Sequence, residues 1–120
     1  MGLKQAQRTK VFYGPATISG EGGFYYGKTL DIRIGDVVIL GRDRFKCTYL
    51  YPPKCTEISK IHCYIRIIEG LNRIGVTDRS KNGTFLARGE RMDPTKEYYL
   101  ADGDRFYLAK KENMFVVHMV

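Results

Sequence analysis

Three short polar motifs carry side chains that are suited to binding an anion. They are Gly41-Arg42-Asp43, Ser59-Lys60-Ile61-His62 and Asp78-Arg79-Ser80-Lys81-Asn82-Gly83-Thr84. A guanidinium can bind a phosphate through parallel hydrogen bonds, and hydroxyl and carboxamide groups add neutral donors. A phosphorylated threonine carries about −1.5 to −2 charges and three acceptor oxygens. Residues of these types therefore suit such a group, provided that the three motifs converge in space.

The runs between these motifs have the composition of short β-strands. Eight runs rich in Val, Ile, Tyr and Phe are expected to be strands: residues 24–32, 37–41, 62–68, 74–77, 84–86, 97–100, 105–108 and 114–120. Turn-forming pairs such as Asn82-Gly83 and Asp102-Gly103 separate them. Alternation predicts that Cys63, Ile65 and Ile67 point into the core. Many short strands at this spacing predict an all-β sandwich or barrel, without a convincing helix.

Length and composition indicate one ordinary globular domain. The chain has 120 residues, of which 43% are hydrophobic and 28% charged, and its formal charge is +7. The excess of cations suits an anionic partner but does not choose among nucleic acid, membrane surface and phosphorylated protein. No apolar run approaches the roughly 18 residues of a spanning helix, and the N-terminus lacks the apolar stretch of a secretory signal. We expect a cytoplasmic protein, or the cytosolic domain of a larger one.

Nothing in the sequence indicates catalysis, a metal or another cofactor. The three cysteines, Cys47, Cys55 and Cys63, are odd in number and widely spaced, so we expect reduced structural thiols rather than disulfides or a zinc site. The two histidines, His62 and His118, have no evident nucleophile and acid partner. We expect the protein not to be an enzyme.

The segment from Gly22 to Thr29 satisfies the phosphate-binding loop pattern G-x-x-x-x-G-K-[ST]. That pattern needs a buried strand before it and a helix after it. Residues 17–21 do not look like a buried strand, residues 30–35 alternate and then turn, and the loop itself contains three bulky aromatic residues. We expect a first β-strand here and no nucleotide site.

The three motifs and the later Leu100-Ala101-Asp102-Gly103-Asp104 resemble the forkhead-associated (FHA) domain family, which has Gly-Arg, Ser-x-x-His, Asp-x-Ser-x-Asn-Gly-Thr and Leu-x-x-Gly-Asp in this order. The resemblance covers about residues 23–117. It implies a β-sandwich of two twisted, mainly antiparallel sheets with about eleven strands, and a phosphothreonine site in loops at one end. We expect residues 23–120 to be the FHA domain and residues 1–22 to be an N-terminal lead or an extra edge strand.

The resemblance also implies a role for each motif residue. Those expected to bind the phosphopeptide are Arg42, Ser59, Lys60, Lys81 and Asn82. Those expected to support the site are Gly41, His62, Gly83 and Thr84. Asn82 would hold the peptide backbone, and His62 would hydrogen-bond the loops from beneath. Lys81 stands where relatives often have a hydroxyl residue, and Lys60 offers its backbone N–H to the phosphate.

One departure from the family pattern concerns the third loop. Ala87 occupies the position, three residues past Thr84, where the family commonly has a second Asn that braces this loop. That bracing is absent, or another group such as Arg88 supplies it. The departure bears on affinity more than on fold.

The expected partner is a phosphothreonine-containing protein that a Ser/Thr kinase phosphorylates, bound by a monomer without nucleic acid or membrane insertion. One alternative is an FHA-fold scaffold that does not need phosphate, although Arg42, Ser59 and Asn82 are all present. Another is nucleic-acid binding through basic residues and tyrosines such as Tyr49 and Tyr51, but no nucleic-acid motif accompanies them. Partner preference is expected to come from two variable segments, residues 44–58 and 88–96.

Overall fold

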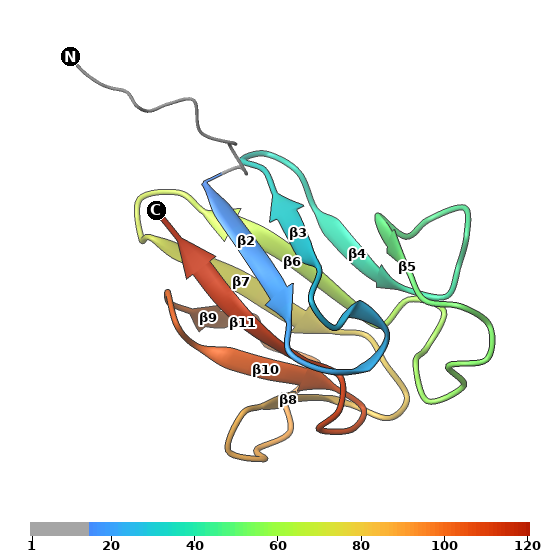
Figure 1. Ribbon diagram of the computed structural model, residues 1–120. Coiled ribbons are helices and arrows are strands. Elements are labelled where there is room, and N and C mark those ends of the chain that lie inside the picture. The colour runs from blue at the N-terminus through green and yellow to red at the C-terminus, as the bar shows by residue number, and fades with distance from the viewer. Residues whose placement is uncertain (1–14) are drawn as a thin grey trace.

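The computed structural model describes residues 15–120, which form two five-stranded β-sheets and a single 3-10 turn, η1 (Gly23–Tyr25) (Figure 1). The first sheet has the strand order β3 (Thr29–Ile32), β2 (Ala16–Gly20), β11 (Met114–Met119), β10 (Arg105–Leu108) and β8 (Thr84–Leu86). The second has the order β5 (Tyr49–Leu50), β4 (Val38–Gly41), β6 (Cys63–Ile68), β7 (Arg73–Asp78) and β9 (Tyr98–Leu100). Every pairing is antiparallel except that of β4 with β5.

This architecture confirms the predicted all-β sandwich of two mainly antiparallel sheets. Residues 15–120 contain ten strands, against the expectation of about eleven. The buried apolar side chains come from both sheets and form one cluster, which includes Ile18, Leu40, Ile74, Phe106 and Phe115. One core therefore holds the two layers together, as a chain of this size allows.

The predicted alternation of β6 is also confirmed. Cys63 and Ile65 are fully buried and Ile67 packs against the core, whereas Arg66 on the opposite face is exposed. The registers Leu40↔Cys63 and Cys63↔Asp78 align the end of β4, the start of β6 and the end of β7. The loops that leave these three points therefore begin at the same edge of the sheet.

The N-terminal part of the fold differs from the prediction in two ways. The expected strand over residues 24–32 begins only at Thr29, because Gly23–Tyr25 form a 3-10 turn and Gly27 has a positive φ. The segment that did not look like a buried strand is β2, whose Ala16 and Ile18 are buried. The small and short polar residues of this strand, Thr17, Ser19 and Gly20, concealed the alternation.

β2 is therefore not an extra edge strand, since it lies between β3 and β11 and pairs with both. The rest of the expected N-terminal lead, residues 1–14, lies outside the described residues. The chain ends of the described part meet at one end of the sandwich, where the Val120 N–H donates to the Pro15 carbonyl at 3.2 Å. The loops after β4, β5 and β7 lie at the opposite end (Figure 1).

Ile18→Ala tests whether β2 belongs to the cooperative core. Because Ile18 is 0% exposed, we expect the free energy of unfolding to fall by about 2–5 kcal/mol in urea denaturation. His118→Ala is the control, because His118 is exposed on the neighbouring strand and its loss should change stability by less than about 0.5 kcal/mol. Equal effects of the two substitutions would show that β2 contributes little to the core.

Candidate functional site

We call the segments that carry the three motifs the first loop (after β4), the second loop (before β6) and the third loop (after β7). The first loop begins where its backbone contacts that of the second loop. A Cβ atom at Gly41 would collide with the carbonyl oxygen of Lys60, so only glycine allows this approach. The Arg42 N–H then donates to the carbonyls of Ser59 and Lys60 at 3.2 and 3.0 Å, and the Arg42 Nε donates to the carbonyl of Ile58 at 2.5 Å. Arg42 is thus fixed against the second loop through both its backbone and its side chain.

Arg42 forms no ion pair with a carboxylate of residues 15–120. Its neighbour Asp43, the obvious candidate, instead accepts a hydrogen bond from the Phe45 N–H at 2.9 Å. The guanidinium therefore keeps its charge uncompensated by the described part of the chain, at a partly exposed position beside the second loop.

The second loop contacts the third through Ser59. The Lys81 N–H donates to Ser59 Oγ at 2.9 Å. A hydroxyl has one donor and two acceptor sites, so this bond leaves the Ser59 O–H able to donate elsewhere. The side chains of Lys81 and of Lys60, the residue after Ser59, are exposed. The structure thus brings Arg42, Ser59, Lys60 and Lys81 to one surface.

His62 is completely buried beneath these loops. Its Nδ1 accepts a hydrogen bond from the Ser59 N–H at 3.0 Å, so the ring proton is on Nε2, which donates to the Gly83 carbonyl at 2.9 Å. Burial lowers the pKa of His62 from its ordinary value of 6.5, against the opposing effects of the Gly83 carbonyl and the Asp78 charge. A neutral imidazole thus joins the second loop to the third.

The third loop is closed by one buried carboxylate. Asp78 Oδ1 accepts from Ser80 Oγ at 2.6 Å and from Thr84 Oγ1 at 2.8 Å, so both ends of the loop are tied to the end of β7. Gly83 has a φ of 98°, which favours glycine, and its carbonyl accepts from the Ala109 N–H at 2.9 Å in addition to His62. The β10–β11 hairpin is thereby attached to the same loop.

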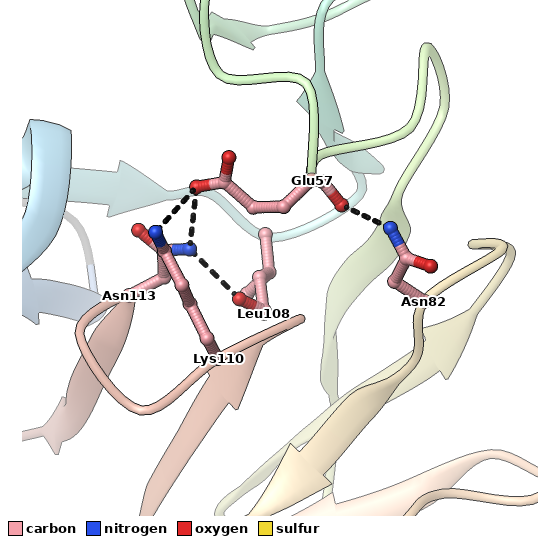
Figure 2. Close-up of polar contacts among 5 residues, drawn as sticks. All are labelled: Glu57, Asn82, Leu108, Lys110 and Asn113. Atoms are coloured by element: carbon pink, nitrogen blue, oxygen red, sulfur yellow. Dashed lines mark hydrogen bonds and ion pairs between the residues drawn. The ribbon is translucent and has the colours of Figure 1, made fainter.

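Asn82 points across to the second loop, where its Nδ2 donates to the carbonyl of Glu57 at 3.0 Å (Figure 2). Figure 2 also shows the Asn82 side-chain oxygen directed away from Glu57. The Glu57 carboxylate faces the β10–β11 hairpin, where Asn113 Nδ2 donates to it at 3.3 Å and Lys110 Nζ lies at 3.8 Å. Asn113 Nδ2 also donates to the Leu108 carbonyl at 2.9 Å, which fixes the hairpin.

Several of these supporting residues were not predicted. Glu57 and Asn113 were not singled out because their contact joins positions 56 residues apart, and Glu112-Asn113 looked only like a turn. Arg88, the suggested replacement for the missing Asn at Ala87, pairs with Glu90 at 3.2 Å on the surface. It is Arg91 that reaches the third loop, by donating from Nη2 to the Lys81 carbonyl at 3.0 Å.

One cation of the third loop turns away from the others. Arg79 lies over the Tyr64 ring, with Cζ 5.2 Å from the ring centroid, and its Nη1 donates to the Pro94 carbonyl at 3.3 Å. The other basic residues of the three loops include Arg42, Arg44, Lys46, Lys60 and Lys81, and Arg91 and Lys110 contact these loops from outside.

Within residues 15–120, no cluster of three or more His, Cys, Asp or Glu side chains is arranged to hold a metal ion. The helical part of the described chain is one short turn, and no helix in it could cross a membrane. The P-loop-like segment forms η1, a turn and the start of β3, so it lacks the helix that a nucleotide site requires.

Comparison with known proteins identifies similar sequences and folds. The FHA domain family model matches residues 38–109. The FHA domain of an Arabidopsis thaliana hypothetical protein is 26% identical, with 88% of this chain and 85% of that chain covered and a TM-score of 0.75. The MEK1 FHA domain in complex with a HOP1 phosphothreonine peptide is 24% identical, with 88% and 97% covered and a TM-score of 0.70.

The N-terminal FHA domain of S. cerevisiae Rad53p, solved with a phosphothreonine peptide, is 19% identical, with 88% of this chain and 93% of that chain covered and a TM-score of 0.68. Among curated proteins, none matches the chain significantly.

The lowered pKa of His62 predicts how stability depends on pH. Below the ordinary value of 6.5 the unfolded chain takes up a proton at this residue more readily than the folded chain, so the free energy of unfolding should fall as the pH falls. In urea denaturation between pH 8 and pH 5, we expect the free energy of unfolding to fall less for His62→Gln than for the wild type.

If His62→Gln does not fold, the imidazole of the wild-type protein can be titrated by NMR instead. A pKa for His62 at or above 6.5 would contradict the buried neutral state.

Asn113→Ala tests the brace between the β10–β11 hairpin and the second loop. The side chain is only 4% exposed and its loss leaves the Leu108 carbonyl without that donor, so we expect the free energy of unfolding to fall by about 1–3 kcal/mol. Glu112→Ala, at the exposed neighbour, is the matched control. If urea denaturation gives an effect no larger than that of the control, Asn113 does not stabilise the contact between the hairpin and the second loop.

Proposed function

Since the chain belongs to the FHA domain family, we propose that it binds protein segments that contain phosphothreonine. The family is one of interaction modules, and we assign no catalytic step to this chain. The MEK1 and Rad53p domains with the same fold were solved with phosphothreonine peptides, which supports the same class of ligand here.

The observation that carries the proposal is the hydrogen bond from the Lys81 N–H to Ser59 Oγ, beside an Arg42 that is anchored to Ile58. The first contact joins the second motif to the third, and the second contact joins the first motif to the residue before Ser59, which supports a shared site. The Arg42 Nε is occupied by the Ile58 carbonyl, so its two terminal nitrogens would bind the phosphate oxygens. The Ser59 hydroxyl would add a neutral donor, and Lys60 and Lys81 would add positive charge.

Asn82 would hold the peptide rather than the phosphate. Its Nδ2 is directed at Glu57, and its oxygen, directed away from Glu57, would accept a backbone N–H of the bound segment (Figure 2). Contacts to the main chain fix the position of a peptide without reading its side chains. In this arrangement Gly41, His62, Gly83 and Thr84 shape the loops and do not touch the ligand.

The proposal extends to the partner and the setting. We propose that the bound protein is a substrate of a Ser/Thr kinase, that the domain acts as a monomer, and that it works in the cytoplasm.

A scaffold that binds without phosphate is the second candidate, which a comparison of matched phosphorylated and unphosphorylated peptides distinguishes. A nucleic-acid binder would shift mixed oligonucleotides in a gel with steep salt dependence.

Arg42→Ala is expected to weaken binding of a phosphothreonine peptide mixture about 10- to 150-fold, because charge-assisted contacts of about 1.5–3 kcal/mol are lost. Fluorescence anisotropy with a mixture degenerate at the flanking positions measures this. Arg42→Lys should recover part of the affinity, since it keeps the charge but not the planar fork. Arg73→Ala, which removes an exposed arginine at the far end of β7, is the control.

Wild-type affinity in Arg42→Ala, with thermal unfolding unchanged, would exclude Arg42 from the site. Equal affinity of the wild-type protein for the unphosphorylated mixture would favour the phosphate-independent scaffold instead.

A further inference from the structure

The turn between β4 and β5, residues 43–47, is ordered by its own hydrogen bonds. The Lys46 and Cys47 N–H groups donate to the Asp43 carbonyl at 3.2 and 3.0 Å, and the Phe45 N–H donates to Asp43 Oδ1 at 2.9 Å. Both ends are attached to the second loop, because the Asp43 N–H and Cys47 Sγ donate to the Lys60 carbonyl at 3.1 and 3.3 Å. This recognition turn is thus held beside Ser59 and Lys60.

The recognition turn displays an aromatic ring between two cations. The Phe45 side chain is 88% exposed, and the Arg44 guanidinium lies 5.3 Å from the centroid of its ring. Arg44 and Lys46 are exposed as well. A well-ordered turn that keeps a phenyl ring almost wholly in water has not placed that ring for the stability of the fold. Exposed aromatic residues with adjacent arginine are typical of contact sites.

The charges of the recognition turn are not compensated within the described residues. Its only carboxylate, Asp43, is engaged by the Phe45 N–H, and the nearby Glu57 is directed at Lys110 and Asn113. Arg44 and Lys46 form no ion pair within residues 15–120. Together with the cations at the phosphate position, they exceed the charge of one phosphate, which is at most −2.

We propose that the recognition turn is a second contact region, and that the preferred phosphothreonine segments carry an acidic or phosphorylated residue next to an apolar one. The anionic group would meet Arg44 and Lys46, and the apolar side chain would cover the Phe45 ring. This inference rests on the proposed phosphothreonine site, because the turn and that site share the Lys60 backbone.

An anionic membrane is the other surface with this chemistry. A peptide fits better, because the turn adjoins Arg42 and Lys60 and offers one ring, whereas an interfacial contact buries a broad apolar face. Membrane binding is therefore an outcome that the experiment must separate.

The test compares two phosphothreonine peptide mixtures by fluorescence anisotropy. One has flanking positions drawn from Glu, Asp and Leu, and the other has flanks drawn from Ala, Gly and Ser. We expect the wild type to prefer the acidic mixture and Arg44→Ala/Lys46→Ala to lose about 3- to 20-fold affinity for that mixture only. Phe45→Ala should lower the preference for Leu-containing peptides.

Matched controls come from the β6–β7 hairpin at the other end of the sandwich. Leu71→Ala removes an apolar side chain that is 55% exposed, and Arg73→Ala removes an exposed arginine. Neither control should change binding of either mixture. All variants are at exposed positions, and thermal unfolding verifies that they fold.

The outcomes separate the two proposals. If the wild type binds both mixtures equally and Arg42→Ala abolishes both, the phosphothreonine site stands and the recognition turn has no role in selection. If neither mixture binds, both proposals fail. Loss of binding to phosphatidylserine vesicles in Arg44→Ala/Lys46→Ala, with peptide binding unchanged, would assign the turn to a membrane and overturn the inference.

Discussion

The end of the sandwich that carries the three loops depends on one buried, neutral imidazole. His62 accepts from the Ser59 N–H and donates to the Gly83 carbonyl, so a single buried side chain joins two loops that are adjacent only in the folded chain. An imidazole can accept and donate at the same time only while it is neutral, and burial keeps it so. The imidazole itself leaves no ring nitrogen unpaired beneath the loops, and the charged side chains of Lys60 and Lys81 lie at the surface above it.

Around this imidazole, two loop carbonyls each accept more than one hydrogen bond, whereas Arg42, Arg44 and Lys46 form no ion pair within residues 15–120. The Lys60 carbonyl accepts from two N–H groups of the first loop, and the Gly83 carbonyl accepts from His62 and Ala109. Glu57, whose backbone carbonyl accepts from Asn82, has its carboxylate held by Asn113 and Lys110 (Figure 2). The Glu57 carboxylate is thus paired with groups of the β10–β11 hairpin and not with Arg42, Lys60 or Lys81.

The sequence predicted the layers and most strands because their periodicity is local. The alternation in β6 and the turns around Asn82-Gly83 and Asp102-Gly103 need only neighbouring residues to be recognised. Local pattern misled where aromatic residues mimic a strand, as at Phe24 and Tyr25, and where a buried strand is built from small residues, as in β2. The order of the motifs identified Arg42, Ser59 and Asn82 as candidate binding residues, but their binding roles stay predictions. The contacts of Glu57 with Asn113 and of Arg91 with Lys81 depend on tertiary structure and have no sequence signature.

The close approach at Gly41 has a consequence for how such a domain can diversify. Any side chain there would collide with the Lys60 carbonyl and separate the first and second loops, so Gly41, at the base of these loops, tolerates almost no substitution. The exposed tip of the neighbouring turn, residues 44–46, lies three to five residues further along and meets no such obstacle. If the turn contacts the partner as we propose, mutation at its tip would exchange one partner for another while the base continues to fold in the same way, and new specificity would not reduce the stability of the scaffold.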